Sequence, residues 1–149
     1  MKVISHRGNL TGPQPDKENT PEYIHSALDQ GIDCEVDLWL NNGKLYTGHD
    51  GPENLVTDKF IYDERLWIHA KNLEALQFLS ETGLHYFWHE EDRYTLTSKN
   101  YIWTYTGERT CDRSIIVDNK KDWIEYGYCN CFGVCTDYPL LYFFQSETN

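Results

Sequence analysis

Residues 33–50 read DCEVDLWLNNGKLYTGHD, and this stretch decides how the sheet is built. Two strand-like runs, 34–40 and 44–49, lie on either side of an Asn-Gly pair, which predicts a tight hairpin. Within the first run, Glu35 and Asp37 are two residues apart, so their side chains face the same side of the strand. The apolar residues beside them face the other side. We therefore expect a strand with one apolar face and one face that carries two carboxylates.

Other runs rich in Val, Ile, Tyr and Trp predict further strands. Their ranges are 2–6, 66–71, 85–89, 100–105, 114–118 and 132–136. A second hairpin is expected over 94–105.

Two segments have the caps and the apolar spacing of helices. The first begins at Thr20 with Pro21 behind it and ends at Gly31, and its expected buried face is Tyr23, Ile24, Ala27 and Leu28. The second begins at Asn72 and ends at Gly83, with inward-facing candidates at Leu73, Leu76, Phe78 and Leu79. A short third helix is expected over 120–127.

Strands that alternate with helices predict an α/β fold with a largely parallel sheet and right-handed crossovers. A full eight-unit barrel takes about 250 residues, and 149 residues with few helices are too few for one. We therefore expect one domain, 1–149, built as a reduced or irregular TIM-type (β/α) barrel with few outer helices. Polar groups should gather at the carboxyl ends of its strands, which places five residues there: His6, Arg7, Lys71, His89 and Asp137.

The charge of the chain limits its partners. Its 24 acidic and 13 basic residues give a formal net charge of −11, which repels nucleic acid and anionic lipid surfaces. An acidic protein that handles a phosphate needs a local cation, supplied by arginine and lysine or by a bound metal. We expect a small-molecule substrate, no nucleic-acid partner and no stable membrane association; the sequence leaves the oligomeric state open.

The amino-terminal stretch MKVISHRG enters a strand at once and lacks the apolar core of a signal peptide. No segment approaches the roughly 18 consecutive apolar residues of a membrane-spanning helix. These features favour a cytoplasmic protein.

Each polar motif is ordinary when taken alone. The carboxylates Glu35 and Asp37 repel each other unless a cation lies between them, and Mg²⁺ or Ca²⁺ prefers such oxygen ligands; a solvated strand face is the alternative. His6 can exchange a proton near neutral pH, and Arg7 can bind a phosphate oxygen, although a histidine at a strand end can also serve only as a cap. The His49-Asp50 pair is equally unspecific.

The order of the motifs is more informative. SHRG, ENTPE, EVD and GHD follow one another within 50 residues, and TDYP lies near the end. In this order they resemble the glycerophosphodiester phosphodiesterase family, which belongs to the superfamily of phosphatidylinositol-phospholipase-C-like phosphodiesterases. The matching residues are His6-Arg7-Gly8, Glu18-Asn19-Thr20, Glu35-Val36-Asp37, His49-Asp50 and Thr136-Asp137 with Pro139. The resemblance covers the first third closely and the last strand well, and it is sparse between them.

The resemblance implies metal-assisted hydrolysis of a phosphodiester, on glycerophosphodiesters or a related small diester. His6 would be the general base and His49 the general acid, with Glu35 and Asp37 as ligands of a divalent cation. Arg7 and Lys71 would bind substrate phosphate, and Glu18 would support the metal or orient Arg7. Asp50 and His89 would have supporting roles.

One motif departs from that family. Typical members have Glu-x-Lys on the third strand, where this chain has His69-Ala70-Lys71. His69 can ligate a metal through nitrogen and would then shift the preferred ion from Mg²⁺ or Ca²⁺ toward Mn²⁺ or Zn²⁺. It can instead orient a neighbouring carboxylate, and His89 with Asp92 could join the site.

Two other activities fit the same motifs. A substrate hydroxyl could attack the phosphorus, which would make the enzyme a lyase that releases a cyclic phosphate. A catalytically decayed protein could instead hold a phosphate or sugar phosphate on Arg7 and Lys71 without turnover.

Overall fold

The computed structural model describes residues 1–119 and 130–146. Within these residues ten strands form a single sheet. The strands are β1 (Lys2–His6), β2 (Asp33–Asn41), β3 (Lys44–Thr47), β4 (Asn54–Val56), β5 (Leu66–Ala70), β6 (Tyr86–Phe87), β7 (Tyr94–Leu96), β8 (Ile102–Thr104), β9 (Ser114–Asp118) and β10 (Gly133–Thr136). The helices are α1 (Pro21–Asp29), α2 (Asp58–Ile61), α3 (Leu73–Ser80) and α5 (Pro139–Ser146).

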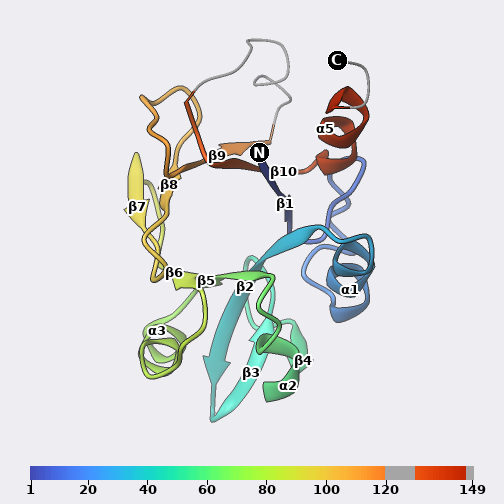
Figure 1. Ribbon diagram of the computed structural model, residues 1–149. Helices are drawn as coiled ribbons and strands as arrows, with labels where there is room; N and C mark the ends of the chain where they lie inside the picture. Colours follow the sequence, from blue (N-terminus) through green and yellow to red (C-terminus); the bar gives the residue numbers. More distant parts are fainter. Residues whose placement is uncertain (120–129, 147–149) are drawn as a thin grey trace.

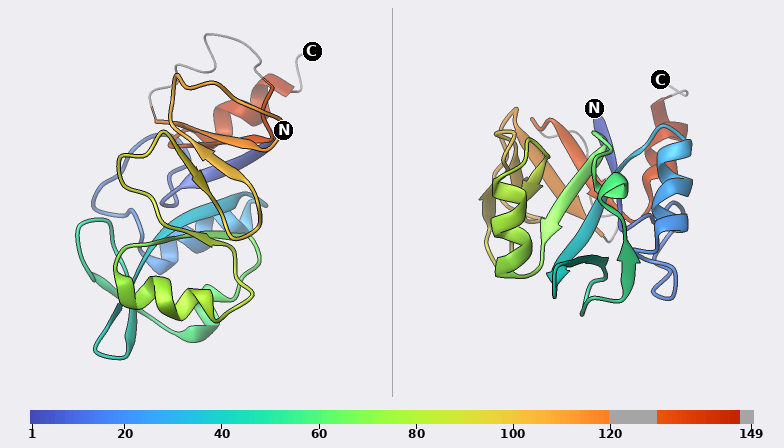
Figure 2. Two further views of the ribbon diagram at one scale, coloured as in Figure 1. Left: turned by 90° about the vertical axis from the view of Figure 1, so that its left-hand side faces the viewer. Right: turned by 90° about the horizontal axis from the view of Figure 1, so that it is seen from below.

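The parallel strands follow one another around a curve in the order β6-β5-β2-β1-β10-β9-β8. The last of these strands in the chain, β10, pairs with the first, β1, so the sheet bends back on itself. Figure 1 shows the strands running around a ring, with α1, α3 and α5 outside it, and the second view in Figure 2 shows α1 and α3 flanking the strands. The sheet is thus a partial barrel in a mixed α/β protein with few helices.

The outer face of the sheet carries the main apolar core. Val36 and Leu38 of β2 and Ile68 of β5 are fully buried there. They pack with residues of α1 and α3, of which Ile24 and Leu79 are almost completely buried. Strands covered by helices in this way need apolar side chains on the covered face, which leaves the other face to form the inside of the barrel.

The inner face is apolar where the strands begin and polar where they end. Ile4, Trp67, Phe87, Trp103, Ile115 and Cys135 form a buried cluster inside the curve. Side chains alternate between the two faces of a strand, so the residue two positions after each of these faces the same interior. Those following residues are His6, His69, His89, Tyr105, Val117 and Asp137. The floor of the barrel is therefore a packed core, and its carboxyl end is lined by polar groups.

The secondary structure expected from the sequence is largely confirmed. The hairpin β2–β3 pairs Asn41 with Lys44 across the turn, and β7 pairs antiparallel with β8. The side chains of Thr20 and Asn72 cap α1 and α3 as expected. The expected helix over 120–127 lies outside the described residues.

Three expectations need correction. Several strands are shorter than expected, and the run 85–89 is a strand only at Tyr86–Phe87. Leu73, expected to face inward, is 70% exposed because it is the first residue of α3 and lies beyond the edge of the core. The short elements β4 and α2 and the terminal helix α5 were not expected, since brief segments have too few residues to show a period. None of the helices in the described ranges is long and apolar enough to cross a membrane.

The loop after β3 depends on a glycine. Gly48 has φ = 155°, and a Cβ atom there would clash with the carbonyl oxygen of Gly51. Its own carbonyl accepts a 2.7 Å hydrogen bond from Trp39 Nε1. The backbone that presents His49 is therefore accessible only to a residue without a side chain.

We predict that Gly48→Ala destabilises the protein by about 2 kcal/mol or more, because the added methyl group meets backbone that cannot move aside. Gly51→Ala is the matched control: a Cβ there has no neighbour within 4 Å, and it should change the free energy of unfolding by less than about 0.5 kcal/mol. Urea denaturation measures both. Equal effects of the two substitutions would contradict this account of the turn.

Candidate active site

A pocket of about 330 Å³ opens at the carboxyl end of the partial barrel. Its lining residues are His6, Arg7, Glu35, His49, His69, Lys71, His89, Glu90, Trp103, Tyr105, Val117 and Asn119. Four of the six histidines of the chain lie here together with an arginine and a lysine. In a protein of net charge −11, this is a local concentration of groups that can carry positive charge.

Glu35 and Asp37 of β2 are buried charged groups at the wall of the pocket. Glu35 is 2% exposed and Asp37 is fully buried. Asn19 binds Asp37 twice, because its Nδ2 donates to Asp37 Oδ2 at 2.8 Å and its Oδ1 accepts from the Asp37 backbone N–H at 2.9 Å. Two carboxylate oxygens, Glu35 Oε2 and Asp37 Oδ1, are buried without a hydrogen-bond partner in the described part of the chain. Buried acceptors of this kind normally have a partner, so the site calls for a cation or a donor.

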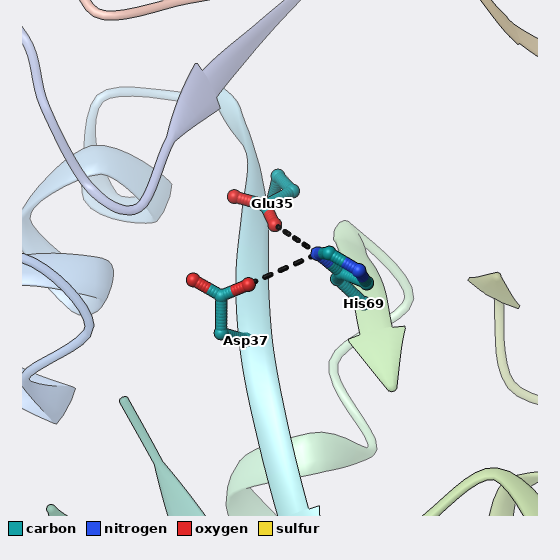
Figure 3. Close-up of side chains that lie close together, drawn as sticks. All are labelled: Glu35, Asp37 and His69. Carbon is teal, nitrogen blue, oxygen red and sulfur yellow. Dashed lines mark ion pairs between the residues drawn. The ribbon is translucent and has the colours of Figure 1, made fainter. Parts of the chain in front are cut away.

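His69 of β5 faces this pair (Figure 3), since its register places it beside Asp37. Its Nδ1 lies 3.0 Å from Asp37 Oδ1 and 3.7 Å from Glu35 Oε1. Glu35, Asp37 and His69 are the group within the described residues whose potential ligand atoms all lie within 4.8 Å of one another. Two carboxylates and an imidazole are suitable ligands for a divalent ion. The residues present therefore fit the metal that the resemblance implies.

Burial and charge act differently on the two carboxylates. Burial and the negative charge of Asp37 raise the pKa of Glu35. Burial opposes ionisation of Asp37 as well, but His69, Arg7 and Lys71 lower its pKa below the ordinary value. The surroundings therefore favour the ionised form of Asp37 and disfavour that of Glu35.

His6 and Asp137 form a hydrogen-bonded pair at the meeting point of the first and last strands. His6 Nδ1 lies 2.7 Å from Asp137 Oδ1, while Nε2 is directed to the Glu35 side at 3.9 Å from Oε2. Burial alone would lower the pKa of His6, but the hydrogen bond to Asp137 and the charge of Glu35 outweigh it and raise the pKa. A carboxylate on Nδ1 leaves Nε2 available to exchange a proton with a molecule in the pocket.

Arg7 is held at the pocket wall by carboxylates on both sides. Its Nη1 donates to Glu18 Oε2 at 3.3 Å, and its Nε lies 3.1 Å from Asp37 Oδ2. The residue has φ = 56°, and its backbone N–H and carbonyl bind Glu35 and Asn19 respectively. Of the two roles expected for Glu18, this contact fits the one in which it orients Arg7.

Asn9 links the arginine side of the site to the histidine side. It is fully buried, and its Nδ2 donates to Glu18 Oε1 at 2.9 Å and to Asp137 Oδ1 at 2.8 Å. The side chains that orient Arg7 and His6 are therefore parts of one buried network, in which each member fixes the next.

The remaining expected residues lie at the rim. Lys71 Nζ is 3.8 Å from Asp37 Oδ1. The His49 side chain is 45% exposed, and its Nδ1 lies 2.7 Å from Asp50 Oδ1. His89 Nδ1 lies 3.1 Å from Asp92 Oδ2, and burial and the charge of His69 lower the pKa of His89.

Several site residues were not expected from the sequence. Asn9 and the asparagine of the ENT motif, Asn19, act through side-chain amides, for which no spacing rule exists. Trp103 and Tyr105 follow the alternation on β8 and could have been placed by it. The partnership of Asp137 with His6 requires knowing that β10 lies beside β1.

Comparison of the chain with protein-family models, with curated proteins and with solved structures finds no match. The resemblance to glycerophosphodiester phosphodiesterases therefore rests on the ordered motifs alone.

We predict that Asp137→Asn lowers the pKa of His6, since it removes a charge-assisted hydrogen bond and leaves the effect of burial. Because the pKa of His6 is raised in the folded state, protonation of His6 stabilises the fold at pH values below 6.5, the ordinary pKa of histidine. This contribution to stability is lost as the pH rises through the folded-state pKa. The stability advantage of wild type over Asp137→Asn should accordingly shrink between about pH 5.5 and pH 8.5.

Histidine NMR titration and urea denaturation of the metal-free protein measure both quantities. Asp50→Asn is the control, since it alters the exposed pair of His49 and Asp50. It should leave the pKa of His6 unchanged. An unaltered His6 pKa in Asp137→Asn would show that Asp137 does not set the protonation of His6.

Proposed function

We propose that this chain is a metal-dependent phosphodiester hydrolase, a short member of the glycerophosphodiester phosphodiesterase-like enzymes on a reduced TIM-type barrel. The observation that carries the proposal is the arrangement around Glu35 and Asp37. Two buried carboxylates with unpartnered oxygens lie beside a histidine that is paired with a carboxylate, and beside two cationic side chains. Displacement at phosphorus requires these same elements: a proton acceptor, a proton donor and positive charge on the phosphate oxygens.

A divalent cation held by Glu35 and Asp37 would supply Lewis-acid stabilisation of the charge that develops on the phosphate. His6 takes the proton of the attacking water at Nε2, while Asp137 on Nδ1 stabilises the imidazolium that results. As the bond between phosphorus and the alcohol oxygen breaks, His49 gives a proton to that oxygen. Water thus adds to phosphorus, an alcohol leaves, and a phosphomonoester is the second product.

Arg7 and Lys71 bind the non-bridging phosphate oxygens. Arg7 has little freedom to move because Glu18 and Asp37 hold it, so it presents its guanidinium in a fixed position. Lys71 follows β5 directly and lies on the other side of Asp37. A pocket of about 330 Å³ suits a small ligand, and the proposed substrate is a glycerophosphodiester or a related small phosphodiester.

The roles of His6 and His49 can be distinguished with substrates that differ in their leaving group. On a glycerophosphodiester, His6→Ala and His49→Ala should each lower kcat by about 10²- to 10⁴-fold. On bis(p-nitrophenyl) phosphate, His6→Ala should cost as much, but His49→Ala should cost far less, because p-nitrophenolate leaves without a proton. His25→Gln, on the exposed face of α1, is the matched control and should retain full activity.

These rates are measured with metal-stripped protein to which Mg²⁺, Ca²⁺, Mn²⁺ or Zn²⁺ is added singly. ³¹P NMR of the products separates a hydrolase from a lyase, which would accumulate a cyclic phosphate. Absence of turnover with every ion, combined with phosphate binding that Arg7→Ala abolishes, would replace this proposal with a phosphate-binding protein.

A further inference from the structure

We infer that His69 is itself a metal ligand through Nδ1, and that it makes the site select Mn²⁺ or Zn²⁺ over Mg²⁺ and Ca²⁺. The inference rests on the proposed function in that it concerns the same cation site. It goes beyond that proposal because it assigns a nitrogen ligand and an ion class to a position where the related enzymes have a carboxylate.

The tautomer of the His69 ring leaves Nδ1 available to a metal ion. His69 Nε2 lies 2.9 Å from the backbone carbonyl oxygen of His89. A carbonyl oxygen can only accept a hydrogen bond, so Nε2 carries the hydrogen. A histidine ligates a metal as the neutral ring, in which Nδ1 has a free lone pair, and this atom lies 3.0 Å from Asp37 Oδ1 and 3.7 Å from Glu35 Oε1. Three atoms that can donate electron pairs thus lie within 4.8 Å of one another, close enough for one metal ion to bind all three.

Neighbouring groups fix the His69 ring in this orientation. Its plane stacks on Phe87 at a centroid distance of 5.1 Å and an angle of 12°. The turn that provides the His89 carbonyl is closed by Asp92, whose Oδ2 accepts from the Glu90 backbone N–H at 2.9 Å and lies 3.1 Å from His89 Nδ1. A hydrogen bond from the far nitrogen of a histidine to a carbonyl is the usual way in which proteins orient a metal-binding imidazole.

The chemistry of the three ligands determines which divalent ions the site prefers. Mg²⁺ and Ca²⁺ prefer oxygen ligands, and Mg²⁺ gives up water reluctantly. Imidazole nitrogen suits later divalent ions, whose affinity for mixed nitrogen and oxygen sites is higher. Exchanging a carboxylate for a neutral imidazole also removes one negative charge, and this weakens the attraction for hard ions in particular. Glu35, Asp37 and His69 together should therefore favour Mn²⁺ and Zn²⁺.

The test is pulsed EPR of Mn²⁺ bound to the metal-stripped, full-length protein, together with calorimetric titration of Mn²⁺ and Mg²⁺. We expect electron spin echo modulation from a directly bound imidazole ¹⁴N in wild type. The modulation should be lost in His69→Glu, which restores an all-oxygen site. The same variant should lower the ratio of Mn²⁺ to Mg²⁺ affinity by about tenfold or more, and His25→Gln should change neither quantity.

Other results separate the inference from the proposed function. Tight Mn²⁺ binding without ¹⁴N modulation, or modulation that persists in His69→Glu, would overturn the inference and leave the cation site of the proposed function intact. Absence of divalent-ion binding in wild type would overturn both. A His69→Glu variant that fails to fold by circular dichroism is replaced by His69→Gln, in which the ¹⁴N modulation should also disappear.

Discussion

The burial of Glu35 and Asp37 on one face of β2 is the constraint on which the rest of the site depends. Removing Glu35 and Asp37 from water is costly unless nearby groups compensate their charge. The chain compensates Asp37 with the amide of Asn19, the guanidinium of Arg7 and the ammonium of Lys71. It leaves one oxygen of each carboxylate without a hydrogen bond. That residual imbalance is the physical reason for proposing a cation at this position.

The partial barrel makes such an arrangement possible. Its parallel strands direct alternate side chains inward, and several change from an apolar residue near the start to a polar one at the carboxyl end, as from Ile4 to His6 and from Trp67 to His69. The pairing of β10 with β1 brings Asp137 to His6 across nearly the whole length of the chain. Groups from distant parts of the sequence therefore converge on one pocket.

Much of this could be predicted from the sequence, because the signals were local. The alternation on β2 placed Glu35 and Asp37 on one face, and the caps at Thr20 and Asn72 set where helices begin. The contacts that could not be predicted depend on the order of the strands in the sheet or on hydrogen bonds of side-chain amides. The contact of His6 with Asp137 needs the closure of the sheet, and Asn9 has no periodicity that marks it as a bridge. The prediction that Leu73 faces inward was wrong, because helical spacing does not show where the core ends.

The central claim is that Glu35 and Asp37 hold a cation against a phosphodiester. The most direct measurement is anomalous diffraction from crystals grown with Mn²⁺ and a non-hydrolysable phosphonate diester. The account predicts an anomalous peak within bonding distance of both carboxylates, with the phosphonate between that peak and Arg7. It is contradicted if this position holds no ion while the analogue is bound elsewhere, or if the carboxylates are neutralised by protein groups alone.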